Sequence, residues 1–497
     1  MRTKLFSAAC WSLALTATAE PLTLIQVQKS LASKNAPWTA ADTGVIESLG
    51  VYQKANPFGL AAMPEGDDGA LEIEDKNQSA DLPSALDWRN YEGMNFLSSI
   101  RNQAFCGSCV AFAAIGAFEG RLKVAAKSPQ MSVDLSEQHL FQDIGGCDSG
   151  SFPQLAAMSL QSSGTTDEAC TPYTLGRMGM SKGASECADV KSRLHKIDGY
   201  TSLSKSKIKA ALQNGPVTTA MAVFEDFMFY KSGIYQHTTG KRLGGHAVGI
   251  VGYDDVAGVW IVRNSWGTSW GEDGYFRIPY NNDSGVGNGG IAYKVADPAI
   301  EVGLDNAQNF AVLSGKVKIQ GVSYRGTSLK SVRYTLQGRG ANSFSSVKGS
   351  IDLNSLEAEI DTTALETGVY ELSVISERQD GSPSNPWFQL VQVVNGEQNI
   401  AMTLVPEFPT DKPASGRVYI RLESKFEKVG LTFADIHFRK TDGSAEKTVR
   451  TENPGDAAKV GWRTPMMPNG EYEVTAEGFL GDLQHFTSNK LIVNIAN

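Results

Sequence analysis

The sequence has no apolar run that reaches the roughly 18 residues needed to cross a bilayer, so we predict no integral membrane segment. Basic residues are not in excess either. The 45 lysines and arginines are outnumbered by 54 aspartates and glutamates, which gives a formal net charge of −9. That balance argues against general binding to nucleic acid or to anionic membranes. The sequence has no metal-ligand motif and no phosphate-binding glycine loop, so we predict neither a metal nor a cofactor.

Cysteine is scarce and confined to the first part of the chain, with six residues of which Cys187 is the last. Residues 1–19 have the pattern of an export signal, with a positive start, a mostly apolar middle and an Ala-Thr-Ala cleavage site. We therefore expect a secreted or periplasmic protein, in an oxidising compartment where disulfide bonds persist. Cys10 would leave with the signal.

Cys109 directly precedes residues 110–118, which are apolar on nearly every face and predict a buried helix. A cysteine in the first turn of a helix lies where free N–H groups and the helix dipole favour a thiolate. The alternative for a single such cysteine is a small buried apolar residue. Downstream, two segments carry a candidate base, His246, and a candidate residue to orient it, Asn264. Gln103 is close enough upstream to direct its amide at an oxyanion formed on Cys109.

With their flanking residues, these positions resemble the papain-like cysteine peptidases. The matching motifs are Gln103-Ala-Phe-Cys-Gly-Ser-Cys109, Gly244-Gly-His-Ala247 and Asn264-Ser-Trp-Gly-Thr-Ser-Trp-Gly271. Cys109 and His246 are 137 positions apart, which is within the range of that family. The resemblance implies an α+β catalytic domain in which a helical lobe and a β-barrel-like lobe face each other across a cleft.

The resemblance also implies a role for each residue of the site. Cys109 would attack the peptide carbonyl, His246 would hold the thiolate and donate a proton, and Asn264 would orient the imidazole. The Gln103 side chain and the Cys109 backbone N–H would form the oxyanion hole. Two tryptophans, which also make sense as core residues, would shield the imidazole–amide hydrogen bond from water and pack beside it: Trp266 and Trp270.

Substrate is expected to contact three further residues: Gly150, Gly245 and Lys294. Gly150 lies in a segment whose family counterpart pairs with an extended peptide, although Ser149 stands where the family usually has a second glycine. If Lys294 faces the main specificity pocket, it would favour an acidic second residue before the cut; a solvated lysine is the alternative. Val110 replaces the usual aromatic residue after the nucleophile, so we expect a tuned activity.

If Cys109 stays free as the nucleophile, four cysteines remain, which suits two disulfide bonds. The residues alone leave three pairings open. The resemblance implies that Cys106 pairs with Cys147, tying the nucleophile loop to the substrate cleft. Cys170 and Cys187 would then close a local loop.

The composition of the chain suggests its division into domains. Residues 20–81 resemble a short propeptide with a polar linker; we interpret it as the enzyme's own inhibitor, with a folding aid or spacer as the alternatives. Residues 82–300 form the predicted peptidase domain. Beyond it, two sequence anchors recur at offsets of 101 and 102 residues, one of them a Gly-x-Tyr motif expected to begin a strand with a buried tyrosine. The repeat predicts two immunoglobulin-like or fibronectin-like β-sandwich modules, at residues 301–399 and 400–497.

The sequence therefore predicts a secreted, zymogen-type cysteine endopeptidase that hydrolyses polypeptides through a thioester acyl-enzyme. Endopeptidase action is expected because no paired histidines suggest a dipeptide-removing loop. The β modules would bind a surface, a polymer or a protein substrate, or act as spacers. Two alternatives stay open: an inactive secreted binding or adhesion protein, and an enzyme that transfers the acyl group to an amine instead of water.

Overall fold

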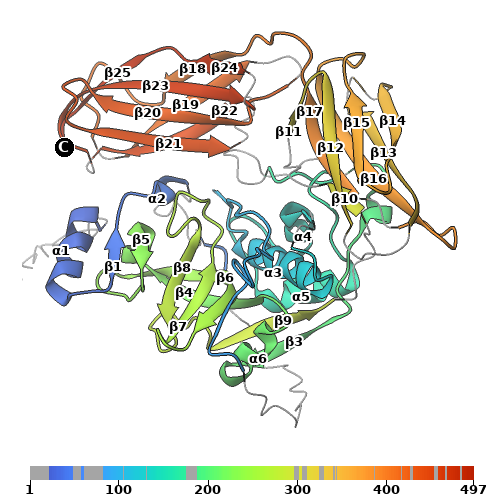
Figure 1. Cartoon of the computed structure of the whole chain (residues 1–497). Helices are drawn as coiled ribbons and strands as arrows, with labels where there is room; N and C mark the ends of the chain where they lie inside the picture. Colours follow the sequence, from blue (N-terminus) through green and yellow to red (C-terminus); the bar gives the residue numbers. More distant parts are fainter. Residues whose placement is uncertain are drawn as a thin grey trace, which may run out of the picture.

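A computed structural model shows how the chain folds (Figure 1). The predicted export signal and the acidic linker before the peptidase domain lie outside the residues it describes. Among the helices it describes, none is long and apolar enough to cross a membrane. The described residues are 22–48, 58–60, 82–104, 106–129, 131, 133–174, 187–295, 302–304, 311–323, 329–339, 342, 344–384, 387–415, 417–425, 429–452, 457–464, 467–481 and 484–497.

The described part of the predicted propeptide begins with a capped helix. Thr23 and Gln26 exchange hydrogen bonds that close the first turn of this helix. The strand that follows pairs antiparallel with β5 (Tyr230–Gly233) of the peptidase domain. Trp38 is buried against two tyrosines and donates its indole N–H to the Gln236 carbonyl, so it anchors this segment to the peptidase domain. The elements are α1 (Leu24–Lys34), β1 (Trp38–Ala40) and α2 (Val45–Ser48).

The helical lobe is built around α3, the helix that begins at the predicted nucleophile. Fifteen of its residues are buried, as the apolar run predicted, and the burial continues past that run. Arg121 is buried there because its guanidinium donates to three backbone carbonyls. Ser136 caps the next helix by accepting a hydrogen bond from the His139 N–H. The helices are α3 (Cys109–Ala125), α4 (Glu137–Ile144) and α5 (Pro153–Ser162).

A seven-stranded sheet forms the other lobe, in the order β3-β9-β4-β6-β7-β8 with β2 also paired to β6. The strands are β2 (Ala85–Asp87), β3 (Gly199–Ser204), β4 (Val217–Phe224), β6 (Arg242–Asp254), β7 (Val259–Arg263), β8 (Tyr275–Pro279) and β9 (Gly289–Lys294). The short helices around them are η1 (Val190–Arg193), η2 (Lys205–Lys207), α6 (Ile208–Leu212) and η3 (Glu225–Phe229).

Beyond the peptidase domain the described chain is almost entirely strands, which form two modules of two sheets each. Module 1 pairs β10-β12-β15 in one sheet and β11-β17-β16-β13-β14 in the other. Its strands are β10 (Val302–Leu304), β11 (Ala311–Leu313), β12 (Lys316–Ser323), β13 (Leu329–Gly338), β14 (Ser346–Ile351), β15 (Glu357–Asp361), β16 (Gly368–Arg378) and β17 (Trp387–Val393).

Module 2 repeats this plan, with β18-β19-β22 facing a sheet of β21-β20-β23-β24 in which β25 also pairs with β23. The repeated Gly-x-Tyr motif begins β16 in one module and β23 in the other, and both tyrosines are buried as predicted. The strands are β18 (Ala401–Pro406), β19 (Arg417–Lys425), β20 (Phe433–Lys440), β21 (Glu446–Glu452), β22 (Ala457–Arg463), β23 (Gly470–Leu480), β24 (Gln484–Thr487) and β25 (Leu491–Ile495).

The two modules contact different parts of the chain (Figure 1). Module 1 meets the peptidase domain, where Arg193 forms an ion pair with Glu371. Module 2 meets the propeptide, where α2 contacts β22 and Lys447 forms an ion pair with Asp42. The modules are therefore packed against the rest of the protein through specific contacts.

Candidate active site

Cys109 is the first residue of α3 and is fully buried. Its Sγ accepts a hydrogen bond from the Ala247 N–H at 3.2 Å, which places the thiol beside the strand residue that follows His246. The sulfur thus lies where the N-terminus of a buried helix meets the central strand β6. Such a position favours negative charge on sulfur once solvent can reach it.

His246 lies on β6 opposite Met221 of β4 and is held by a hydrogen bond to Asn264. The distance from His246 Nε2 to Asn264 Oδ1 is 2.8 Å, and the same oxygen accepts the Ser265 N–H at 2.8 Å. Because an amide oxygen only accepts, Nε2 must carry a proton. The lone pair of the imidazole is therefore on Nδ1, which can take a proton from a thiol.

Two tryptophans cover this hydrogen bond. The Trp266 ring stacks on the His246 ring with centroids 4.9 Å apart and an interplanar angle of 27°. Trp270 packs edge-on against Trp266 at 5.0 Å, and both indoles are buried. The imidazole therefore has little freedom to rotate away from Asn264.

Gln103 is fully buried with its amide held at both ends. Its Oε1 accepts a hydrogen bond from Ser265 Oγ at 2.7 Å, and its Nε2 donates to the Cys106 carbonyl at 3.0 Å. Because Ser265 occupies the oxygen, the nitrogen is the end that points into the nucleophile loop. This orientation suits a donor to an oxyanion formed on Cys109.

Residues 58–60 of the propeptide lie across the site and contact both lobes. The Leu60 N–H donates to the Gly245 carbonyl at 3.3 Å, and the Gly59 carbonyl accepts from the Ser151 N–H at 2.8 Å. A Cβ on Gly59, whose φ is +89°, would lie 1.9 Å from the Gly107 carbonyl oxygen, so only glycine fits there. The Phe58 ring packs edge-on against the His246 ring at 6.0 Å.

The covered site is neutral. Burial raises the pKa of the Cys109 thiol to about 12, and the Ala247 N–H offsets only part of this effect. Burial also lowers the pKa of His246 to about 4, against the opposing effects of Asn264 and the Phe58 backbone. A thiolate–imidazolium pair is therefore disfavoured while the site is covered.

The predicted substrate-contacting residues lie in different surroundings. Gly150 and Gly245 line the path of the propeptide, where a Cβ on either would collide with Gly59 or Leu60. Lys294 lies at the exposed end of β9, opposite Gly199 of β3. Its predicted role in specificity stays a prediction.

Disulfide bonds join Cys106 to Cys147 and Cys170 to Cys187, the pairing that the resemblance implied, and Cys109 is free. The first bond links the nucleophile loop to the segment that contains Gly150, and the Gly107 N–H donates to the Cys147 carbonyl beside it.

Three contributors to the site are not evident from the sequence motifs. Residues 58–60 fill the cleft, Ser265 orients the Gln103 amide, and Tyr173 contacts the backbone of Gln103. The propeptide segment could have been suspected from a glycine between two large apolar residues, shortly before the acidic linker. Ser265 lies inside the Asn264–Gly271 motif, but the motif does not say which side chain it contacts, and Tyr173 lies outside the motifs.

A buried thiol at a helix N-terminus, beside a strand whose imidazole is bonded to an amide, is the arrangement expected of a cysteine nucleophile and its base. A family model described as papain family cysteine protease matches residues 82–298. Cathepsin B-like CP3 of Giardia intestinalis is 37% identical over 46% of this chain and 76% of its own length. Cathepsin B-like CP2 of the same organism is 33% identical over 54% of this chain and 92% of its own.

The chain belongs to the papain family of cysteine proteases, with cathepsin B-like relatives. Among solved structures, it is similar to proCathepsin B S9 from Trypanosoma congolense, with 24% identity and a TM-score of 0.47. That match covers 55% of this chain and 98% of the other.

Proposed function

We propose that the protein is an exported cysteine endopeptidase, synthesised as a latent precursor, that hydrolyses peptide bonds through a thioester on Cys109. The observation that carries this proposal is that Cys109 lies beside the residue following His246, whose imidazole is held by Asn264. It rests on the 2.8 Å hydrogen bond to Asn264 and on the Ala247 N–H contact to the sulfur.

In the proposed reaction, His246 Nδ1 takes the proton of Cys109, and the thiolate attacks the peptide carbonyl carbon. Negative charge develops on the carbonyl oxygen, where Gln103 Nε2 and the Cys109 N–H are the candidate donors. The protonated imidazole then gives its proton to the departing amine, leaving a thioester. Water, deprotonated by His246, attacks the thioester and releases the acid and the free thiol.

Latency is supported by the position of residues 58–60. They bond to Gly245 on one lobe and to Ser151 on the other, so a substrate peptide has no access to the sulfur while they remain. The neutral thiol and imidazole also support latency. By burying both groups, the propeptide disfavours the thiolate–imidazolium pair as well as covering it. The propeptide is therefore the proposed inhibitor of its own enzyme.

Mass spectrometry of the purified precursor tests both parts of this proposal. The precursor is incubated with a thiol reductant, alone and with an epoxide-type cysteine-protease inhibitor, and a Cys109→Ala variant is the matched control. We expect one adduct on Cys109 and inhibitor-sensitive loss of the segment before about residue 82. Labelling without processing would support the enzyme and assign activation to another protease.

An unlabelled Cys109 in a reduced, folded sample from which the propeptide has been removed would contradict the enzyme. The inactive binding protein would then be the better description. Product analysis with an added amine separates hydrolysis from acyl transfer, since the transferase would yield the amide.

A further inference from the structure

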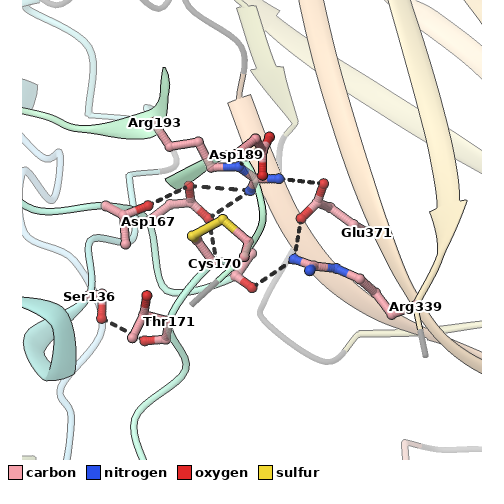
Figure 2. The surroundings of a disulfide bond; sticks show 11 residues. Ser136, Asp167, Cys170, Thr171, Asp189, Arg193, Arg339 and Glu371 are labelled. Atoms are coloured by element: carbon pink, nitrogen blue, oxygen red, sulfur yellow. Dashed lines mark hydrogen bonds and ion pairs between the residues drawn. A yellow bond between two sulfur atoms is a disulfide. The ribbon is translucent and has the colours of Figure 1, made fainter. Parts of the chain in front are cut away.

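Arg193 lies at the centre of a buried contact between the peptidase domain and module 1 (Figure 2). Its guanidinium meets three carboxylates: Nη2 is 2.6 Å from Glu371 Oε1, Nε is 3.0 Å from Asp189 Oδ2 and Nη1 is 3.3 Å from Asp167 Oδ1. Its Cζ also lies 3.5 Å from the ring centroid of Phe388 in module 1. Only 3% of the Arg193 side chain is exposed, so this contact is largely dry.

Glu371 makes a second link across the same contact. Its Oε2 accepts a hydrogen bond from Arg339 Nη2 at 2.5 Å, and that nitrogen also donates to the Ala169 carbonyl at 3.1 Å (Figure 2). Glu371 is 12% exposed and comes from β16, whereas Ala169 belongs to the peptidase domain. Loss of its charge would leave Arg193, which is almost fully buried, without its nearest carboxylate, so the contact would rearrange.

The peptidase side of this contact is a loop, residues 167–173, that is bonded along its length. Asp167 Oδ1 accepts the Cys170 N–H at 2.9 Å, and Cys170 is joined by its disulfide bond to Cys187. Ser136 Oγ donates to the Thr171 carbonyl at 2.6 Å (Figure 2). A displacement at Asp167 would therefore shift the loop as a unit.

The end of this loop reaches the active site through Tyr173. Its O–H donates to the Gln103 carbonyl at 2.9 Å, and its oxygen lies 2.7 Å from Ser108 Oγ. Its backbone N–H donates to Glu168 Oε1 at 2.7 Å, which holds the tyrosine to the loop. Gln103 carries the candidate oxyanion donor, and Ser108 directly precedes the nucleophile.

We propose that module 1 positions the oxyanion hole, with Glu371 and Arg193 as positioning residues for hydrolysis. This inference rests on the proposed function, because it assigns a role within that reaction. Movement of the 167–173 loop carries Tyr173, and with it the backbone of Gln103. The Gln103 amide stabilises an oxyanion only from within hydrogen-bond distance. A misplacement of about 1 Å can lower a rate by about a hundredfold.

Glu371→Gln in the processed enzyme tests the proposal, with Glu377→Gln as the matched control. Glu377 is on the same strand, but its ion pair, with Lys330 at 2.6 Å, lies within module 1. The measurements are kcat and KM for a fluorogenic peptide, the affinity of a peptide aldehyde, and the rate of alkylation by iodoacetamide. The aldehyde adduct uses the oxyanion hole, whereas alkylation of a thiolate forms no oxyanion.

For Glu371→Gln we expect kcat and aldehyde affinity to fall by about tenfold, while KM and the alkylation rate stay within about twofold. Glu377→Gln should leave all four within about twofold of wild type. Tyr173→Phe, which removes the hydroxyl but keeps the ring, should give the same separation of hydrolysis from alkylation.

An unchanged kcat in folded Glu371→Gln overturns the proposal. Equal losses of hydrolysis and alkylation also overturn it, because they mean that the thiolate itself was disturbed. A processed wild-type enzyme that neither hydrolyses nor is alkylated means instead that the proposed function has failed. If Glu371→Gln does not fold, Arg339→Gln replaces it, since that side chain is 33% exposed. A loss of kcat of about threefold with normal alkylation then supports the proposal, and no change overturns it.

Discussion

The two β modules share one plan but differ in what they contact. In each, a buried tyrosine at the start of a central strand donates to a carbonyl four residues earlier: Tyr370 to Glu366 and Tyr472 to Pro468, both at 2.9 Å. Module 1 joins the peptidase domain through the buried Arg193 cluster. Module 2 joins the propeptide through α2 and the Lys447–Asp42 ion pair.

The two contacts differ in the form of the protein, precursor or processed enzyme, in which each would be present. In the proposed processing, which removes the segment before about residue 82, the contact of module 1 would remain and could act on the working enzyme. The same processing would remove the contact of module 2 with the predicted propeptide, so that contact could act only on the precursor. The two modules therefore have similar folds but different expected effects, because each effect depends on the surface that the module contacts.

The largest expected effect tests whether either module supplies a catalytic group. Cys109→Ala should lower peptide hydrolysis and self-processing by at least about 10⁴-fold, because the nucleophile is removed while both module contacts stay in place. Hydrolysis of a fluorogenic peptide and gel analysis of the precursor measure the two losses. Appreciable remaining activity would mean that a group outside the described site takes part.

The next effect compares the precursor with the processed enzyme. The raised pKa of the Cys109 thiol, about 12, leaves about one thiol in ten thousand ionised at pH 8 in the precursor. Only the thiolate reacts with iodoacetamide, so precursor alkylation should rise with pH throughout the alkaline range.

The processed enzyme should already react near neutral pH, at least about a thousandfold faster than the precursor, because His246 then stabilises the thiolate. Rates are measured by mass spectrometry on precursor sampled before it is cut. Equal pH profiles for the two forms would mean that the propeptide does not control ionisation.

A smaller effect sets the upper limit for the loss of kcat that a change in module 1 can cause through the Gln103 amide. Gln103→Ala should lower kcat by about 10²- to 10³-fold with little change in alkylation, because one oxyanion donor is lost. Steady-state kinetics with the same peptide check this. The drop caused by Glu371→Gln must be smaller; a larger one would show that module 1 acts through something other than this amide.

The smallest effect concerns module 2. Lys447→Gln should speed propeptide loss by roughly fivefold, since a partly buried ion pair contributes about 1 kcal/mol to the closed form. Asp42→Asn should have the same effect, and combining the two changes should add little. The time course of processing on gels measures these rates.

Lys490→Gln is the matched control for module 2, because its ion pair with Glu473 lies within that module. Unchanged processing in Lys447→Gln would make this contact incidental to latency. A change in the kcat of the fully processed Lys447→Gln enzyme would remove the distinction between the modules.

Much of the local structure was predictable because its causes lie close together in the chain. The apolar run after Cys109 predicted a buried helix, since the pattern that marks a helix lies within a few residues. The two sequence anchors predicted repeated strands, which begin as expected at β16 and β23. The crossing of the cleft by residues 58–60 was not predictable in the same way, because it depends on surfaces formed by both lobes.

By itself, the sequence determined the chemistry that this protein can perform. Cys109, His246, Asn264 and Gln103 are recognisable from their motifs, because each role demands a particular functional group in a characteristic setting. Only the tertiary structure decided what covers that site and what supports it. Arg193 and Glu371 are 178 residues apart, and Asp42 and Lys447 are 405 apart. Such pairings arise where folded surfaces meet, and no local pattern along the chain records which surfaces these are.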